Sequence, residues 1–228
     1  MGRLKILLLS AMFGSTLATN LMGQDWPNLK AFEADNAAIG PPKEGENRVV
    51  FMGNSITIGW LEARPDFFKG KPYINRGISG QTTPQMLVRF RQDVLDLSPK
   101  VVVLLAGTND IAGNTGPSSL KMIMDNIRSM AELAKTNGIK VVLCSVLPVY
   151  DYPWKPGLEP AEKIIRLNKM IKEYALANDC QYLDYFSALV DDRNGLPKKY
   201  AEDGVHPNGE GYRVMEPLVT EAITTALE

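Results

Sequence analysis

The residues best suited to acid–base chemistry lie near the C-terminus, in the segment Asp203-Gly204-Val205-His206-Pro207. His206 is the only histidine of the 228-residue chain, so any imidazole chemistry near neutral pH must use this side chain. Asp203 precedes it by three residues, and a short turn can place the carboxylate on one ring nitrogen while the other faces outward. The alternative is an ordinary surface loop, because these residue types are common in loops.

Such a base needs a nucleophile, and Ser55 is the candidate. It follows Gly53 and a β-rich run, so a tight turn from a strand into a helix exposes its hydroxyl and leaves its backbone N–H free. The alternative is that Ser55 only caps the next turn. The surrounding residues do not form the Gly-x-Ser-x-Gly pattern of the α/β-hydrolases.

Two other glycine-bearing loops carry candidate donors for a developing oxyanion. Gly80 has no Cβ and precedes a helix N-terminus, so its N–H can approach an anionic ligand, although the glycine can equally serve the turn alone. Asn109 follows a buried strand, and its side-chain amide is a neutral donor. We expect Asp110 to order its own loop through backbone N–H groups rather than to react.

Strand-like runs separated by helical segments must position these loops. We expect strands at Arg48–Met52, Tyr73–Ile78, Lys100–Ala106, Lys140–Val146 and Gln181–Tyr185. We expect helices at Trp26–Ala38, Pro84–Leu97 (capped by Thr83), Ser118–Asn137, Ala161–Asn178 and Glu210–Leu227. Unbroken apolar strands alternating with helices predict a parallel sheet in a three-layer α/β/α sandwich. An antiparallel α+β domain is the alternative, but no tight hairpin turn joins two of the strands.

The predicted sheet explains how distant loops can form one site. In an open parallel sheet, ligands bind outside the carboxyl ends of the strands. The loops of Ser55, Gly80 and Asn109 follow the first three strands, and the Asp203–His206 turn comes after the fifth. All four loops are therefore expected at one rim of the sheet.

These segments resemble the four blocks of the SGNH (GDSL-type) hydrolase family. The matching residues are Phe51–Thr57, Gly80, Gly107–Asp110 and Asp203–Pro207, in the family's order. The resemblance spans essentially the whole chain after residue 23. It implies a flavodoxin-like, five-stranded sheet of order 2-1-3-4-5 and an esterase that uses a serine nucleophile.

The resemblance also assigns roles to residues. It implies that Ser55 is the nucleophile, His206 the base and Asp203 its partner. It implies that the N–H groups of Ser55 and Gly80 and the Asn109 side chain hold the oxyanion. The family usually has aspartate where this chain has Asn54, a change that should alter local hydrogen bonding and leave the mechanism intact.

The substrate is predicted from aromatic residues near the same rim. Tyr150, Tyr152 and Trp154 lie in the loop Pro148–Pro160 after the fourth strand, where they can stack on a sugar face or simply pack the loop. In the first case, Asp151 or Lys155 of this loop can bond to sugar hydroxyls. Trp60 is a further candidate for a pocket wall or a core position. Such a chain resembles the carbohydrate O-acetylesterases of polysaccharide-degrading bacteria, which implies hydrolysis of acetyl esters on sugars. The alternatives are a lysophospholipase- or thioesterase-like acyl hydrolase and a non-catalytic carbohydrate-binding module.

Composition and the N-terminus set the remaining expectations. Residues 1–23 have the basic start and apolar stretch of a secretory signal peptide, which predicts a secreted or periplasmic hydrolase domain at 24–228 without stable membrane insertion. A net charge of −1 gives no sign of a nucleic-acid partner. With one histidine and the cysteines Cys144 and Cys180, we expect no metal site, free thiols and no organic cofactor.

Overall fold

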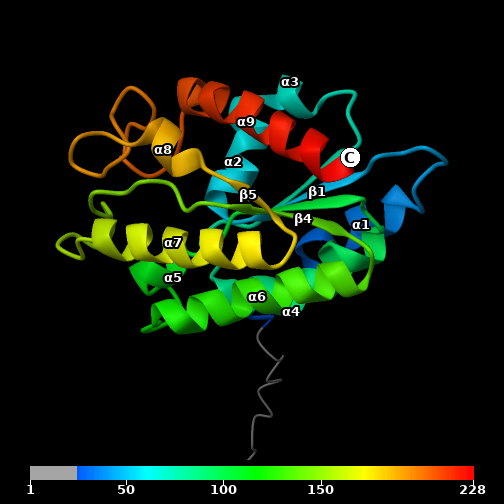
Figure 1. Ribbon diagram of the computed structural model, residues 1–228, viewed down its shortest axis with the longest axis horizontal. Coiled ribbons are helices and arrows are strands. Elements are labelled where there is room, and N and C mark those ends of the chain that lie inside the picture. The colour runs from blue at the N-terminus through cyan, green and yellow to red at the C-terminus, as the bar shows by residue number, and fades with distance from the viewer. Residues whose placement is uncertain (1–24) are drawn as a thin grey trace, which may run out of the picture.

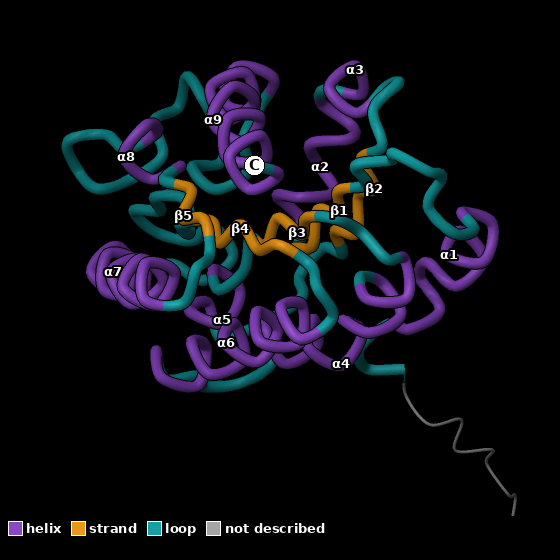
Figure 2. Tube along the Cα trace, turned by 45° about the vertical axis from the view of Figure 1, so that its right-hand side comes forward, coloured by secondary structure: helices purple, strands orange, loops and turns teal. Residues whose placement is uncertain are grey.

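A parallel five-stranded sheet with helices on both faces organises the chain (Figures 1 and 2). The computed structural model describes residues 25–228, so the predicted signal peptide lies outside the described residues. The strand order is β2-β1-β3-β4-β5, with every pair parallel, which confirms the predicted fold class. The strands are β1 (Val49–Gly53), β2 (Tyr73–Gly77), β3 (Val101–Leu104), β4 (Lys140–Cys144) and β5 (Gln181–Leu183).

The helices form the two outer layers. They are α1 (Glu33–Ile39), α2 (Ser55–Ala63), α3 (Pro65–Phe68), α4 (Thr83–Asp93), α5 (Thr108–Ala112), α6 (Leu120–Thr136), α7 (Ala161–Ala177), α8 (Tyr185–Leu189) and α9 (Gly209–Leu227), with short 3₁₀ turns at Leu29–Phe32 and Leu95–Leu97. Helices α4, α6 and α7 cover one face of the sheet, and α2, α8 and α9 cover the other (Figure 2).

The apolar strands supply a core on each face of the sheet. Along β1, Val50 and Met52 face the core under α4 and α6, whereas Val49 and Phe51 face the core under α2 and α9. This alternation follows from the period of two residues in a strand. A strand buried on both faces needs apolar residues at every position, which is why these strands read as unbroken runs.

Three helix details differ from the sequence-based expectation. The predicted helix Trp26–Ala38 is a 3₁₀ turn at Leu29–Phe32 followed by α1, because Asn28 has a left-handed backbone conformation (φ 56°) that no helix can include. Thr82, not Thr83, is the N-cap of α4, and its backbone N–H donates to Gln85 Oε1 at 3.1 Å, as in a capping box. The helix ends at Asp93, and a 3₁₀ turn replaces the rest of the predicted span. The predicted strands begin and end within two residues of the observed ones.

Glycines at the carboxyl ends of β1 and β2 allow α2 to pack directly against the sheet. A Cβ on Gly53 would lie 2.0 Å from Thr57 Oγ1, and a Cβ on Gly77 would lie 2.3 Å from the backbone nitrogen of Ile58. Both distances are far inside van der Waals contact. The start of α2, which carries Ser55, therefore depends on two residues without side chains.

Candidate active site

The structure brings Ser55, His206 and Asp203 together in series. Ser55 Oγ lies 2.9 Å from His206 Nε2, and His206 Nδ1 lies 2.6 Å from Asp203 Oδ2. The serine and the histidine are 151 residues apart in the chain. A hydroxyl bonded to an imidazole that a carboxylate orients is an arrangement that can remove the hydroxyl proton during attack on a carbonyl.

A local turn before the last helix holds the imidazole of His206 in place. Asp203 Oδ1 accepts hydrogen bonds from the backbone N–H groups of Val205 at 2.9 Å and His206 at 2.8 Å. The turn passes through Gly204, whose φ is +74°, a conformation that favours glycine. Asn208 then caps α9, its Oδ1 accepting from the N–H groups of Glu210 and Gly211.

The same contacts set the charge of the carboxylate. Burial raises the pKa of Asp203, but hydrogen bonds from the His206 ring and from the N–H groups of His206 and Val205 outweigh it. The pKa of Asp203 therefore lies below its ordinary value. Near neutral pH, Asp203 is therefore a carboxylate, which can accept a hydrogen bond from His206 Nδ1 while Nε2 faces Ser55.

Ser55 is the first residue of α2, and Asn54 is its cap. Asn54 Oδ1 accepts from the Ile56 N–H at 3.0 Å, so the helix does not need the Ser55 side chain as its N-cap. Asn54 is buried, and its Nδ2 has no hydrogen-bond partner among residues 25–228. Asn54 thus makes the capping bond and also carries a buried donor without a partner in that part of the chain.

The three predicted oxyanion donors differ in the bonds that they make. Within the described part of the chain, neither the Ser55 N–H nor the Gly80 N–H has an acceptor. The φ of Gly80 is +76°, which again favours glycine. Asn109, at the start of α5, donates through Nδ2 to the Gln81 carbonyl at 3.0 Å, and an amide nitrogen has a second hydrogen to offer.

Polar contacts join the Gly80 loop to the turn that follows β3. Asn114 Nδ2 donates to the Gly80 carbonyl at 3.2 Å, and the hydroxyls of Thr82 and Thr115 are 2.9 Å apart.

The carboxyl of Asp110 has a different hydrogen-bond partner from the predicted one. Its carboxyl accepts from the Thr83 N–H at 3.0 Å and from Thr83 Oγ1 at 2.6 Å, so it orders the neighbouring loop at the start of α4.

The burial of Asp110 predicts a pH-dependent stability. Burial raises the pKa of this carboxyl to about 6, from an ordinary value of 3.8. Between these values Asp110 holds a proton in the folded chain that it releases in the unfolded chain, so its contribution to the free energy of unfolding should fall as pH rises from about 4 to about 6. Two pKa units correspond to about 3 kcal/mol. Urea unfolding across this range should therefore show the wild type losing stability relative to Asp110→Asn as pH rises; parallel curves would contradict the assignment.

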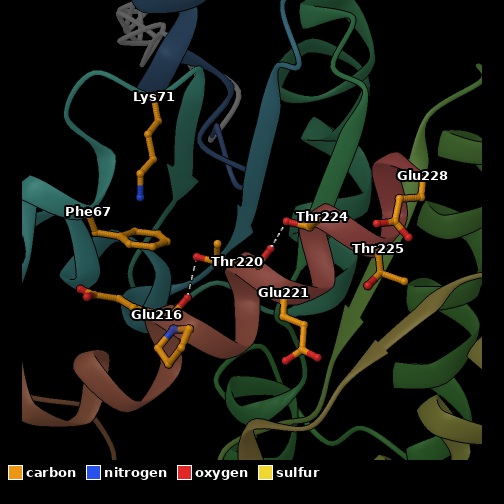
Figure 3. Close-up of a pocket in the computed structure, with 9 residues that line it drawn as sticks. Phe67, Lys71, Glu216, Thr220, Glu221, Thr224, Thr225 and Glu228 are labelled. Carbon is orange, nitrogen blue, oxygen red and sulfur yellow. Dashed lines mark hydrogen bonds between the residues drawn. The ribbon is translucent and has the colours of Figure 1, made fainter.

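A surface hollow opens beside the Ser55 hydroxyl. It has a volume of about 570 Å³ and is lined by Ser55, Ile58, Gly59, Glu62, Ala63, Ser79, His206, Pro207 and Tyr212. A larger hollow of about 760 Å³ lies between α3 and the second half of α9 (Figure 3). Its threonines Thr220 and Thr224 bond to carbonyls of α9 itself, and it contains none of the predicted site residues. The smaller hollow is therefore the one onto which the candidate triad opens.

Two of the predicted substrate contacts are core residues instead. Trp60 is 3% exposed and stacks on Tyr212 and Phe67 at ring distances of 5.2 and 4.9 Å. Tyr152 is fully buried, and its hydroxyl donates to the Thr108 carbonyl at 2.9 Å. Neither ring can contact a sugar in this arrangement, because protein atoms cover both; Tyr152 supports the helix that carries Asn109.

The other two aromatic candidates face solvent. Trp154 is 45% exposed, and its ring centre lies 6.0 Å from that of His206. Tyr150 is 55% exposed and lies under the Arg193 guanidinium, 5.1 Å from the ring centre. Lys155, also considered as a hydroxyl ligand, instead donates to the Ala112 carbonyl at 2.8 Å, at the C-terminal end of α5.

Hydrogen bonds within the same loop hold it together, and the sequence did not predict them. Asp151 accepts from the N–H groups of Gly157 at 2.7 Å and Leu158 at 3.2 Å. The carboxylate, expected to bond to a substrate hydroxyl, thus holds its own loop together. Among residues 25–228, Cys144 and Cys180 are free and buried, and no cluster of three or more His, Cys, Asp or Glu side chains has the geometry to hold a metal.

The comparisons with known proteins assign the chain to a family. The model of the GDSL-like lipase/acylhydrolase family matches residues 51–214, a span that includes every residue of the candidate triad. The chain belongs to this family, as its resemblance to the SGNH group implied. None of the helices in residues 25–228 combines the length and apolarity needed to cross a bilayer.

Solved structures and curated relatives agree with this assignment. A GDSL-like lipase from Bacteroides thetaiotaomicron is 50% identical, with a TM-score of 0.85, covering 88% of this chain and 98% of that one. An acetylxylan esterase of Xylanibacter ruminicola is 27% identical over 82% of this chain and 45% of its own length. An uncharacterized lipoprotein of Bacillus subtilis is 36% identical over 47% of this chain and 51% of its own length. The alignments thus span about half the length of these two curated relatives.

Proposed function

We propose that the protein is a serine esterase that releases acetyl groups from carbohydrates. The observation that carries the catalytic part is the continuous series of hydrogen bonds from Ser55 through His206 to Asp203. A serine hydroxyl is a weak nucleophile until a base accepts its proton. Here the base lies within hydrogen-bonding distance, and its second nitrogen is fixed by a carboxylate.

The reaction follows from these positions. As Ser55 Oγ attacks the ester carbon, its proton passes to His206 Nε2 and the carbonyl oxygen becomes an oxyanion. The N–H groups of Ser55 and Gly80 and the second amide hydrogen of Asn109 stabilise that charge. His206 then gives this proton to the sugar oxygen of the ester as the bond from that oxygen to the acyl carbon breaks, so the sugar leaves as an alcohol and an acyl-enzyme remains. Water attacks the acyl carbon, its proton goes to His206, and acetate leaves as Ser55 regains its proton.

The preference for a sugar substrate rests on the surface around the base. Trp154 presents an exposed ring 6.0 Å from His206, and exposed aromatic rings offer flat apolar faces with low conformational-entropy cost. A second hollow of about 260 Å³ is lined by Asp203, Tyr150 and Arg193, so further sugar units have room to bind on the Asp203 side of the base. The acetylxylan esterase relative is consistent with this substrate class.

The experiment is acetate release from acetylated xylo-oligosaccharides by the wild type and by Trp154→Ala. We expect release by the wild type, and a KM about three- to tenfold higher in the variant, because one aromatic contact is worth about 0.5–1.5 kcal/mol. The KM for p-nitrophenyl acetate should change little. Leu176→Ala, which removes another exposed apolar side chain, on α7, is the control. An unchanged KM for the oligosaccharide in Trp154→Ala would contradict the proposed sugar contact.

The rival functions give different results in simple assays. A lysophospholipase- or thioesterase-like acyl hydrolase would favour long p-nitrophenyl esters over the acetate. A carbohydrate-binding module would not react with a serine-directed fluorophosphonate. We expect the fluorophosphonate to label Ser55 and the acetate ester to be the best of the series.

We also propose that the protein acts outside the cytoplasm. The proposal rests on the signal-peptide pattern of residues 1–23 and on the match to a Bacillus lipoprotein. Cell fractionation with an antibody against the domain tests it. Recovery of the uncleaved chain in the cytoplasm would contradict it.

A further inference from the structure

A buried arginine on α4 contacts both strand ends that lead to the candidate nucleophile and its oxyanion loop. Arg89 is fully buried, and four of its N–H groups donate hydrogen bonds to oxygen atoms of the protein. Resting on the proposed function, we propose that Arg89 is a positioning residue that sets the spacing of the oxyanion donors. It contacts neither the nucleophile nor the base among these bonds, so it acts through the backbone that it holds.

The first pair of bonds joins two strands at their carboxyl ends. Arg89 Nη2 donates to the Gly53 carbonyl at 3.0 Å and to the Arg76 carbonyl at 2.9 Å. Gly53 ends β1 two residues before Ser55, and Arg76 is the next-to-last residue of β2, on the way to Gly80. One nitrogen therefore fixes the distance between the chain segments that carry two of the proposed donors.

The second link reaches the third donor. Arg89 Nε donates to Gln81 Oε1 at 2.5 Å, which holds the residue that follows Gly80. The backbone carbonyl of the same Gln81 accepts from Asn109 Nδ2 at 3.0 Å. Arg89 is thus connected to Ser55, Gly80 and Asn109 by short paths of backbone and hydrogen bonds. Charge-assisted bonds of this kind are stronger than neutral ones.

The charge of the guanidinium is balanced on its own helix. Arg89 Nη1 donates to Asp93 Oδ2 at 2.9 Å, one turn along α4. Asp93 Oδ1 in turn accepts from Asn36 Nδ2 at 2.7 Å. Because the ion pair is complete without the loops, the two bonds to strand carbonyls and the bond to Gln81 are available for positioning. Lysine would keep the charge but offers three donors from one point, not a planar fork.

The first test compares Arg89→Lys with Arg48→Lys on p-nitrophenyl acetate. Arg48 is also buried and donates to the carbonyls of Gly40 and Leu97, but it precedes β1 at the opposite end of the sheet. We expect Arg89→Lys to lower kcat about ten- to hundredfold with KM nearly unchanged, since a misplacement near 1 Å can cost about 10²-fold. Arg48→Lys should leave both constants unchanged. Equal kcat values for Arg89→Lys and the wild type would overturn the proposal.

A double-mutant cycle separates positioning from general stability. If Arg89 acts through the oxyanion donors, Asn109→Ala should cost at least fivefold less kcat in the Arg89→Lys background than in the wild type. If Arg89 only stabilises the fold, the loss of kcat in the double variant should equal the product of the losses in the two single variants. That result would overturn the proposal. Failure of the proposed function gives a different result, because the wild type would then show no Ser55-dependent hydrolysis of p-nitrophenyl acetate, whereas failure of the Arg89 proposal leaves that hydrolysis intact.

Variants of Gln81 give a second test that does not depend on the folding of Arg89→Lys. Gln81→Leu removes the acceptor of Arg89 Nε, whereas Gln81→Glu keeps an oxygen acceptor at the same distance from the backbone. We expect Gln81→Leu to lower kcat about tenfold or more and Gln81→Glu to retain most of the wild-type rate. Equal kcat values for these two variants would overturn the proposal.

Discussion

Ser55→Ala is expected to lower kcat for p-nitrophenyl acetate by about 10⁴-fold or more. Alanine has no oxygen to form the acyl-enzyme, so only the donors that hold the oxyanion can still assist water. Among residues 25–228, the Ser55 hydroxyl bonds only to His206, and the helix is capped by Asn54. The thermal midpoint should therefore stay close to that of the wild type, so that a loss of rate cannot be attributed to unfolding.

The shared role of the triad adds a second measurement. His206→Ala should cost about as much as Ser55→Ala, and the double variant should be no worse than either, because residues that act as a unit are strongly non-additive. Ser129→Ala, in α6 on the other face of the sheet, is the matched serine control and should keep the wild-type rate. Full activity in Ser55→Ala, or losses that multiply in the double variant, would rule out the proposed mechanism.

The fold was predictable because its strands are buried on both faces. A run such as Val101–Leu105 has no polar side chain, and such a run is stable only where helices cover both sides of a parallel sheet. Apolar residues at helical spacing between these strands predicted the helices that connect one strand to the next. The strand order 2-1-3-4-5 came from the resemblance to a family and is confirmed by the structure.

The contacts of the aromatic residues were harder to predict, because the local sequence does not determine which way a ring points. Trp60 lies five residues after Ser55, yet its ring stacks on Tyr212 from the far end of the chain. Tyr152 lies in a loop with exposed Tyr150 and Trp154 but turns inward to Thr108. Spacing along a proline-rich loop carries no period that separates inner from outer faces, so only tertiary packing decides.

The polar supports of the site depend on pairs that are distant in sequence. Asp110 bonds to Thr83 across 27 residues, and no motif predicts that pair. Arg89 did leave a signal: it sits between Met86 and Phe90 on the inward face of α4, with Asp93 one turn later. A charged pair on an apolar helix face is seldom buried without a reason, and an inward arginine was the clue available in the sequence.

Asn109→Ala is expected to lower kcat by about 10²–10³-fold with little change in KM, because the amide donor gains its full effect only when the carbonyl oxygen becomes charged. The variant also loses the bond to the Gln81 carbonyl, so stability must be measured alongside rate. Asn168→Ala is the matched control, since its buried amide bonds to the Val146 backbone. That variant should lose stability and keep kcat.

Asn109→Asp distinguishes an oxyanion donor from a structural brace. Neither alanine nor ionised aspartate can donate to the Gln81 carbonyl, so a purely structural role predicts similar rates for the two variants. A carboxylate at this position, however, would place negative charge beside the developing oxyanion. We therefore expect kcat for Asn109→Asp to fall below that of Asn109→Ala at neutral pH, with the gap closing as the carboxyl is protonated. Equal rates for the two variants across the pH range would remove Asn109 from the proposed oxyanion hole.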